Sequence, residues 1–536
     1  MIPRHARPIA ALLLALALAG GCAPAVSTSD GDTAAAADPA TAAASVADAG
    51  TTAGPSSTVA SAGTHEDPAD YAWDAASEVA VTLADGASAG GSGVKVDGDV
   101  VTITRAGTYR LRGTLSDGQV VVDAADEGVV RLVLDGVDLA SSTGAALAVL
   151  DAGKAVVILE AGSQSTLVDA ATYVFPAADV DEPNAALFSA ADLTIAGDGA
   201  LAVAGRSNDG IASKDGLIIA GGEITVDAVD DGIRGKDYLV VTGGTLDVTA
   251  GGDALKADNE EDAALGYVRI AGGTLDLDAA TDGIDAWSAA IIVAGALTIA
   301  AGDDAIHSET RVEVNGGTID ITRSYEGLEG TEIVITGGAI TLVAEDDGLN
   351  VAGGADGSGW QQEGGFPGAP GGPGGRGGAG GAGGGPMVET PVEGWYVEIS
   401  GGTLVIDAGG DGLDSNGSAT VTGGTIVVNG PLTNREGALD VNGDFLVSDA
   451  VLVAAGSIGM DETPSASSSQ ATLHLRFDTL VAAGTVVRIQ APDGTPIATF
   501  RASKDLQSLV VSTPGVVAGA SYEVLTGGTV TGESLG

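Results

Sequence analysis

A unit of about 22 residues that recurs along the chain limits its possible folds more than any other sequence feature. The four residues that begin at Asn208 read Asn-Asp-Gly-Ile, those at Asp230 read Asp-Asp-Gly-Ile, and those at Gly252 read Gly-Asp-Ala-Leu. Between these acidic corners lie a short apolar run, a Gly-Gly turn and a run in which apolar and polar residues alternate. A period in the twenties is typical of a solenoid, in which each unit buries its apolar side against the next.

The second glycine of each turn marks the register of the array. These glycines are Gly222, Gly244, Gly273, Gly295, Gly317, Gly338, Gly402 and Gly424. Most steps are 21 or 22 residues, and the two longer ones equal one period plus 7 and one period plus 42 residues. The excess therefore forms loops outside the stack, a small one near 259–262 and a glycine-rich one over 353–392. Proline is too sparse in the second loop for a collagen helix, which favours a flexible loop.

We predict an all-β fold, a right-handed parallel β-helix in which each unit forms one coil. Its short β runs would pair with their copies one coil later, about 4.8 Å away, through right-handed crossovers. The aliphatic residue after each corner should point inward and form a ladder. This predicted ladder consists of Ile211, Ile233, Leu255, Ile284, Ile306, Leu328, Leu349 and Leu413. Tandem antiparallel sandwiches, the alternative, should show hairpins and an aromatic core, and aromatic residues make up only 3% of the chain.

The N-terminal part has the pattern of an exported, anchored protein. Residues 1–21 combine a positively charged start with an apolar run too short for a membrane span, as in a secretory signal peptide. The only cysteine, Cys22, follows two glycines and resembles the lipidated residue of a bacterial lipoprotein. Residues 22–70 contain few large apolar side chains and predict a disordered tether. We therefore expect an extracellular protein held at the bacterial cell surface by a lipid; ordinary cleavage near residues 23–25 is the alternative.

The rest of the chain is β-patterned throughout but regular only in the middle. Residues 71–205 predict an N-terminal β region that caps and begins the helix, and residues 206–464 form the repeats. Residues 465–536 lose the repeat and predict a small antiparallel β module. Such a module would cover the last coil, since an open strand edge invites aggregation.

The formal charge of −51 excludes one class of partner and favours another. A phosphate backbone is bound by Lys and Arg, so nucleic acid is not expected as a partner. Contact with a membrane should be through the lipid alone, and we predict a monomer. An acidic chain attracts cations, although solubility is the plainer reading of such a charge.

The carboxylates fall in the same phase as the repeat and predict calcium. The corner acids are Asp209, Asp231, Asp253, Asp282, Asp304, Glu326, Asp347 and Asp411, and further oxygen ligands three residues later are Asp285, Glu329, Asn350 and Asp414. Stacked one coil apart, neighbouring carboxylates repel by about 3–4 kcal/mol at an effective dielectric near 20. Only the first coils contain lysines that could offset this repulsion, namely Lys214, Lys236 and Lys256. Hard oxygen donors suit Ca²⁺; alternatively, the aspartates shape turns through side-chain to backbone hydrogen bonds.

The chain resembles a known family, the secreted carbohydrate-binding β-helix proteins of bacteria, which bind cellulose and pectin, contain calcium and are related in fold to pectate lyases. The resemblance extends from about residue 81 to 443 and is most specific over 208–259, where Asn-Asp-Gly-Ile, Asp-Gly-Ile and Gly-Asp-Ala-Leu-Lys-Ala-Asp-Asn occur in succession. It implies a right-handed parallel β-helix, calcium, and binding of plant-type or acidic polysaccharide. It identifies no individual residue that contacts sugar.

A non-catalytic binder of polysaccharide is the function that we predict. Calcium would hold the coils together and bridge protein carboxylates to those of the ligand, and aromatic planes could stack on sugar faces. The candidates for stacking are Trp287, Tyr325, Trp360 and Trp395.

Two other functional classes stay open. A β-helix lyase or hydrolase needs an acid or base concentrated in one coil, whereas the acids here repeat evenly; no catalytic residue is assigned. The basic candidates for a lyase are Arg234, Arg269, Arg311, Arg323 and His307. The second alternative is an adhesin or structural rod that calcium makes rigid.

Overall fold

The computed structural model describes residues 63–126, 128–175, 177, 180–352 and 390–528. They all belong to one compact unit, Ser57–Gly536. The predicted signal peptide, Cys22, most of the predicted tether, most of the glycine-rich insertion and Trp360 lie outside the described residues. Within the described ranges, no helix has the length and apolar character needed to cross a bilayer.

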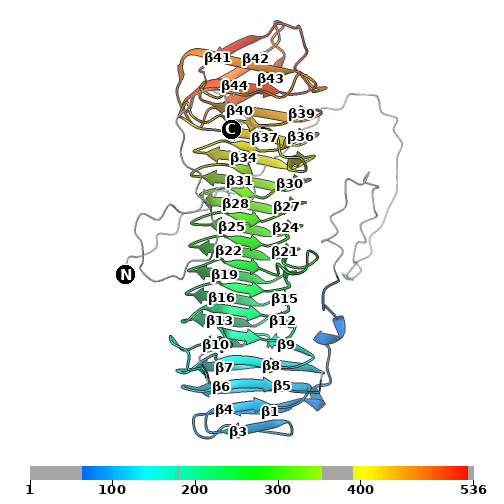
Figure 1. Ribbon diagram of the computed structural model, residues 1–536, viewed down its shortest axis with the longest axis vertical. Helices are drawn as coiled ribbons and strands as arrows, with labels where there is room; N and C mark the ends of the chain where they lie inside the picture. Colours follow the sequence, from blue (N-terminus) through cyan, green and yellow to red (C-terminus); the bar gives the residue numbers. More distant parts are fainter. Residues whose placement is uncertain (1–62, 127, 176, 178–179, 353–389, 529–536) are drawn as a thin grey trace, which may run out of the picture. The chain divides into compact units, whose positions relative to one another are not determined.

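Three strands form each coil, and each pairs in parallel with its copies before and after it, so that the coils stack (Figure 1). The short strands that follow the acidic corners form one sheet, which we call face 1. Face 1 contains β4 (Val100–Ile103), β6 (Gln119–Asp123), β8 (Leu147–Asp151), β11 (Ala185–Ser189), β14 (Asp209–Ser213), β17 (Ile233–Gly235), β20 (Leu255–Ala257), β23 (Ile284–Ala286), β26 (Ile306–Ser308), β29 (Leu328–Glu329), β32 (Leu349–Val351), β35 (Leu413–Ser415) and β38 (Asp440–Val441).

The other two strands of each coil form faces 2 and 3. Face 2 contains β9 (Lys154–Leu159), β12 (Leu193–Gly197), β15 (Gly216–Ile219), β18 (Tyr238–Val241), β21 (Tyr267–Ile270), β24 (Ala289–Ile292), β27 (Arg311–Val314), β30 (Glu332–Ile335), β33 (Tyr396–Ile399), β36 (Ser418–Val421) and β39 (Phe445–Val447). Face 3 contains β10 (Gln164–Val168), β13 (Ala200–Gly205), β16 (Glu223–Ala228), β19 (Thr245–Ala250), β22 (Thr274–Ala279), β25 (Ala296–Ala300), β28 (Thr318–Arg323), β31 (Ala339–Ala344), β34 (Thr403–Ala408), β37 (Thr425–Asn429) and β40 (Val451–Gly456).

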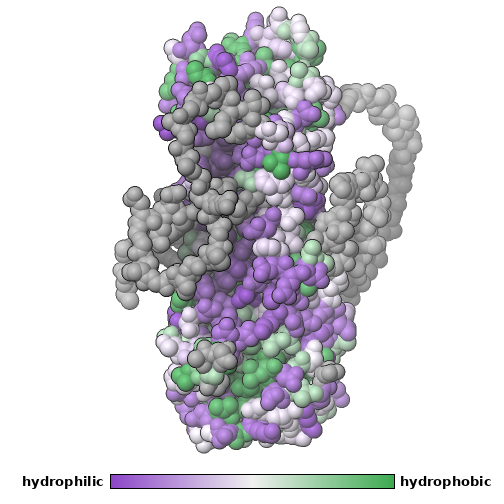
Figure 2. Space-filling model, viewed as in Figure 1, coloured by the Kyte–Doolittle hydropathy of each residue, from purple (hydrophilic) through white to green (hydrophobic). Residues whose placement is uncertain are grey.

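The predicted aliphatic ladder is confirmed as the inner side of face 1. Ile233 pairs with Leu255 and Ile284 with Ile306, and all eight predicted members are fully buried. The turn glycines are confirmed as well, because each has a positive φ that other residues rarely adopt, as at Gly295 with φ 121°. Side chains alternate inward and outward along a strand, so face 3 buries Leu, Ile and Val and exposes Thr, Asp and Glu. Hydrophilic residues accordingly cover much of the middle coils on the side shown in Figure 2.

Both insertions leave the register intact, as predicted. Tyr238 pairs with Tyr267 across the small insertion, and Val351 pairs with Ser415 across the large one. Each loop therefore leaves and re-enters the stack between face 1 and face 2.

The parallel coils begin earlier than the regular repeat. β1 (Val79–Leu83) already pairs in parallel with β5 (Gly107–Leu115), and β5 with β7 (Val129–Ala140). β7 is long enough to pair with both β9 and β10, so it joins face 2 to face 3 without a turn. The missing Gly-Gly turn explains why the sequence shows no clear period there.

Additional antiparallel strands cover both ends. At the N-terminal end, β2 (Ala89–Gly90) pairs with β1, and β3 (Val94–Asp97) pairs with β4. At the other end β44 (Leu506–Ser512) pairs with β40 of the last coil and with β41 (Thr472–Val481). The remaining sheet consists of β42 (Val486–Gln490), β43 (Pro496–Arg501) and β45 (Glu523–Thr526). The small antiparallel module predicted at the C-terminal end is thus present.

Two 3₁₀ turns, η2 (Pro68–Tyr71) and η3 (Ala75–Ser77), precede β1, and η2 is tied to face 2. Asp70 accepts from Lys154 Nζ over 2.7 Å, and Arg131 donates to the carbonyl of Asp70. His65 lies nearby, with Nε2 2.9 Å from Thr194 Oγ1. Residues 63–71, at the end of the predicted tether, therefore pack against the β-helix.

Candidate metal centre

Two columns of polar side chains run side by side along face 1. The corner column consists of the acids at the turn from face 3 to face 1: Asp209, Asp231, Asp253, Asp282, Asp304, Glu326, Asp347 and Asp411. The face column begins one coil later and consists of the residues three positions after the corner position of each coil, which is Gly437 in the last one. The strand register stacks them on one another: Arg234, Lys256, Asp285, His307, Glu329, Asn350, Asp414 and Asp440. In this column each side chain points away from the aliphatic ladder, because its neighbour on the strand points inward.

The corner column is held by hydrogen bonds between successive coils. The backbone N–H of Asp253 donates to Oδ1 of Asp231 over 3.0 Å, and that of Asp282 to Oδ1 of Asp253 over 3.0 Å. The same bond joins Asp411 to Asp347 over 2.6 Å. The turn-shaping role considered for these aspartates is therefore confirmed. Each of these bonds uses the Oδ1 atom of the carboxylate.

Burial makes the charge of the corner column costly. Asp209 is 1% exposed and Asp304 is 7% exposed. Burial, with repulsion from Asp231 second, raises the pKa of Asp209 to about 7. Burial and the neighbouring Asp411 raise the pKa of Asp347 to about 9. Burial also raises the pKa of Asp304 well above its usual range. Without a cation, the carboxyl groups of Asp209 and Asp347 are therefore partly protonated near neutral pH.

Protein cations neutralise the first coils of the array. Arg234 Nη1 lies 3.6 Å from Asp209 Oδ2. Lys256 Nζ forms an ion pair with Asp253 and lies 3.8 Å from Asp231 and 3.2 Å from Asp285. Among the three predicted lysines, Lys256 thus acts as expected. Lys214 instead pairs with Glu182, and no ion pair joins Lys236 to the corner column within the described residues.

Carboxylates converge in the later coils. Donor atoms from Asp304, Glu326 and Glu329 lie within 4.8 Å of one another, and all three side chains are buried. Asn350 Nδ2 donates to Glu326, while Glu329 Oε1 is buried and accepts no hydrogen bond from the described residues. A second group, whose donor atoms also lie within 4.8 Å of one another, consists of Asp411, Asp414 and Asp440. From the sequence, Glu436 and Asp440 continue the acidic pattern one residue out of phase and are not predicted as ligands, whereas the strand register pairs Asp440 directly with Asp414.

A third group, Asp282, Asp285 and His307, is less suited to a hard cation. His307 Nδ1 lies 3.0 Å from Asp285 Oδ1, and Nε2 lies 4.0 Å from Glu329. Although burial favours the neutral ring, the bond to Asp285 and the surrounding acids raise the pKa of His307 to about 9. The imidazolium is itself a cation here. The two all-oxygen groups fit Ca²⁺ better, since calcium takes carboxylate and carbonyl oxygens.

A groove of 540 Å³ lies beside these columns and is bordered by Lys256, Asp285, His307 and Trp287. Trp287 is 38% exposed and follows β23 at the turn to face 2. It is thus placed where a sugar ring could meet both an aromatic plane and the charged columns.

The other predicted aromatic residues do not join Trp287. Tyr325 lies at the opposite turn, from face 3 to face 1, where a hydrogen bond with Asp346 raises its pKa. Trp395 is partly buried and packs against the core, so it anchors the end of the large insertion. The three predicted aromatics within the described residues, Trp287, Tyr325 and Trp395, therefore form no continuous platform.

The basic residues considered for a lyase are dispersed. Arg311 lies on face 2, paired with Glu313 and Glu332 at 2.8 Å each. Arg323 lies on face 3, 3.7 Å from Asp278, and Arg269 lies on β21 of face 2. Only Arg234 and His307 lie on face 1, and both face carboxylates.

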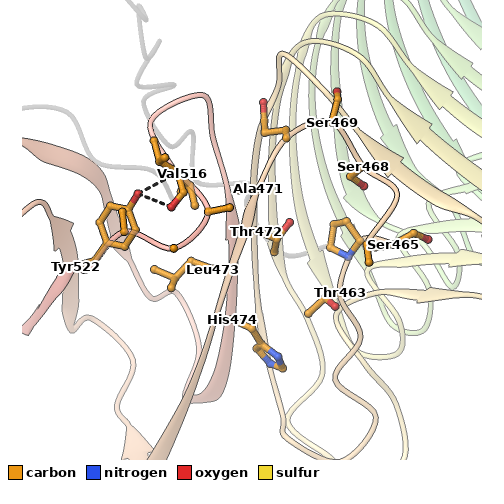
Figure 3. Close-up of a pocket in the computed structure, with 17 residues that line it drawn as sticks. Thr463, Ser465, Ser468, Ser469, Ala471, Thr472, Leu473, His474, Val516 and Tyr522 are labelled. Carbon is orange, nitrogen blue, oxygen red and sulfur yellow. Dashed lines mark hydrogen bonds between the residues drawn. The ribbon is translucent and has the colours of Figure 1, made fainter.

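A second hollow, of 690 Å³, lies in the C-terminal module and was not anticipated from the sequence (Figure 3). Hydroxyl side chains such as Ser465, Ser468 and Thr472 line one side, and the loop before Tyr522 lines the other. The Tyr522 hydroxyl accepts from the Val517 N–H over 2.6 Å. Serine and threonine in an irregular loop gave no signal from which this hollow could have been predicted.

Comparison with known proteins supports the predicted relationship. Residues 97–356, slightly less than half of the chain, match the family described as carbohydrate-binding domain-containing protein. A carbohydrate-binding domain-containing protein of Acetivibrio thermocellus is 38% identical over 136 residues, which are 25% of this chain and 48% of the relative. The chain thus spans about half the length of the curated relative that it matches. A solved structure, described as a polysaccharide lyase-like protein from C. thermocellum in a gadolinium derivative, is 33% identical with a TM-score of 0.44, covering 44% of this chain and 96% of that one.

Proposed function

Residues 97–356 match a carbohydrate-binding domain family, and from this premise we propose that the protein binds polysaccharide along face 1 at the cell surface. Calcium held between the corner and face columns stabilises the β-helix. It also bridges protein carboxylates to those of an acidic, pectin-type chain. Cellulose, which carries no carboxylate, would bind through the aromatic and hydroxyl groups alone.

The observation that carries this proposal is the buried group of Asp304, Glu326 and Glu329. Three carboxylates within 4.8 Å of one another contain more negative charge than the single nearby imidazolium of His307 can balance. The orphaned Glu329 Oε1 has lost its hydration without gaining a hydrogen bond from the described residues, which is costly unless a cation binds. A calcium ion supplies the missing charge and accepts the free oxygen as a ligand.

The net charge supports a bridging ion over direct contact. A chain with formal charge −51 repels a polyuronate at long range. A divalent ion with both protein and sugar carboxylates in its coordination shell reverses that repulsion locally. Binding of an acidic polymer should therefore depend on calcium, whereas binding of cellulose should not.

A non-catalytic role is favoured by the protonation of the two basic groups in the groove. A lyase base must be unprotonated to remove the proton beside the uronate carboxylate. Despite burial, Asp253, Asp285 and Asp231 raise the pKa of Lys256, and the pKa of His307 is raised to about 9. Both groups are held as cations and are poorly suited to accept a proton.

The test is retention of the purified protein on polygalacturonate, pectin and cellulose, with calcium and with a chelator. Calcium-dependent retention without new unsaturated or reducing ends supports the proposal. Release of such ends makes the protein an enzyme, and failure to bind any of the polymers leaves a structural rod.

Two double variants each remove two negative charges, one pair at the proposed calcium site on face 1 and the other on face 3. Glu326→Gln with Glu329→Gln removes two ligands of one proposed calcium site and should weaken retention on polygalacturonate strongly, while the group of Asp411, Asp414 and Asp440 stays intact. Asp247→Asn with Asp320→Asn neutralises two exposed acids on face 3 and should leave retention unchanged. Equal loss in both variants would show that only overall charge matters.

A further inference from the structure

We propose that the Lys256 ammonium holds the place of a metal ion, so that face 1 is divided into a part with its own cations and a part that takes them from solution. This inference deepens the proposed function, on whose calcium sites it rests. It specifies which coils need no metal and where on face 1 the bound ions, and therefore the acidic ligand, are found.

The ammonium lies where carboxylates from three successive coils meet. Lys256 Nζ pairs with Asp253 of its own coil, lies 3.8 Å from Asp231 of the coil before and 3.2 Å from Asp285 of the coil after. Its side chain is 24% exposed. An ordinary surface ion pair joins two side chains and contributes little. A cation surrounded by acids from three coils instead links those coils as a bound ion would.

The strand register makes this position equivalent to that of a proposed calcium ligand. Lys256 pairs with Asp285, Asp285 with His307, and His307 with Glu329. Beside Glu329 lie two corner acids, Glu326 of its own coil and Asp304 of the coil before. Beside Lys256 the two equivalent acids are Asp253 of its own coil and Asp231 of the coil before. The face column holds an ammonium in one place and a carboxylate with a free oxygen in the other, and the next coil offers Asp285 to the first and Asn350 to the second.

Arg234 repeats the arrangement one coil earlier. Its guanidinium lies 3.6 Å from Asp209 and 2.5 Å from Asp258. The face column therefore begins with Arg234 and Lys256, passes through Asp285 and His307, and continues with Glu329, Asn350, Asp414 and Asp440. Protein cations end where the all-oxygen groups begin. The coils before Asp285 should fold without metal, and those from Glu326 onward should need it for full stability.

The test is the number of ions bound by the full chain, measured by calorimetry with Ca²⁺ and by luminescence with Tb³⁺. Lys256→Met frees three carboxylates and should raise the number bound by one. Glu329→Lys places an ammonium where the calcium ligand was and should lower the number by one, while raising the melting temperature of the calcium-free protein. Lys256→Arg keeps the charge and should change neither quantity.

The outcomes separate this inference from the proposed function. If Lys256→Met binds as many ions as the wild type, and the wild type still binds polygalacturonate with calcium, the inference is wrong and the function stands. If the wild type binds calcium but no polysaccharide, and Lys256→Met binds one more ion, the function fails and the inference stands; a wild type that binds no calcium overturns both. If Lys256→Met folds only with calcium, this supports the inference. If it does not fold at all, Glu329→Lys decides, and an unchanged number of ions in that variant overturns the inference.

Discussion

Asp304 is joined to the corner one coil before it, Asp282 and Gly283, through two hydrogen bonds of opposite direction, the first of them between Asp282 and Asp304. The N–H of Asp304 donates to Oδ1 of Asp282 over 2.9 Å, and the N–H of Gly283 donates to the carbonyl oxygen of Asp304 over 2.9 Å. The first bond needs a side-chain acceptor, and the second needs only backbone. The corner acid is therefore part of the coil-to-coil ladder before any metal is considered.

Replacing Asp282 should separate its role as a hydrogen-bond acceptor from the effect of its negative charge. Asp282→Ala removes the acceptor and leaves the Asp304 N–H unpaired in a largely buried turn, which should lower the free energy of unfolding by about 1–3 kcal/mol. Asp282→Asn keeps an oxygen for this bond and removes the repulsion from Asp253, so it should cost much less in calcium-free buffer. Urea denaturation of both variants measures the difference. An equal loss in the two would mean that charge, not the hydrogen bond, is what the fold requires.

The calcium-free protein should lose stability as pH rises. The pKa values in the fold are about 6 for Asp231, about 7 for Asp209 and Asp411 and about 9 for Asp347, each raised mainly by burial from an ordinary value of 3.8. A carboxyl whose pKa is raised by folding stabilises the fold fully below its unfolded pKa and loses this contribution as pH rises through the folded value. The melting temperature with chelator should therefore fall between about pH 4 and pH 9.

Saturating calcium provides the control for that pH dependence. The ion binds the ionised carboxylates, so it should stabilise the protein most at the pH where the calcium-free form is weakest. Curves with and without calcium should converge near pH 4 and separate above pH 6. Parallel curves would show that calcium does not bind at the titrating carboxylates.

The fold of the middle coils could be predicted because its determinants are local and repeated. An inward aliphatic residue such as Ile284 and a turn glycine such as Gly295 keep a fixed distance in every unit. In the first coils β5 and β7 pass from one face to another at a single glycine, Gly113 or Gly136, and not at a Gly-Gly turn, so the parallel pairing there leaves no period in the sequence.

The sequence period predicted which residues lie in the two columns, but not which side chains contact one another. The repeat placed Asp282 and Asp285 in columns, but it could not show that His307 contacts Asp285 over 3.0 Å. The sequence pointed to Arg234 only as a candidate lyase base, although it follows its corner acid by three residues, as Lys256 does. The burial of Trp395 against the core also depends on where the large insertion rejoins the stack, which no local pattern specifies.

Trp287 and Trp395 should respond differently to the same substitution. Trp287 is 38% exposed beside the groove, so Trp287→Ala should weaken polysaccharide binding by roughly three- to tenfold, the value of one aromatic contact, with little change in melting temperature. Trp395→Ala should lower the melting temperature and leave binding by the remaining folded protein unchanged, because this side chain packs against the core. Affinity electrophoresis and thermal unfolding measure the two effects. Loss of binding in Trp395→Ala alone would move the sugar site to the insertion.

His65 should fasten the segment before β1 to face 2. Its Nδ1 lies 2.7 Å from the Tyr238 hydroxyl and 3.1 Å from Asp192, its Nε2 lies 2.9 Å from Thr194 Oγ1, and its side chain is 5% exposed. His65→Ala removes all three contacts, and Tyr238→Phe removes only the hydroxyl. Limited proteolysis should cut near residues 63–70 much faster in His65→Ala and moderately faster in Tyr238→Phe. The melting temperature should change little in either, since the core ladder is untouched. Protection equal to the wild type in His65→Ala would show that the contacts of Asp70 with Lys154 and Arg131 are enough to hold this segment.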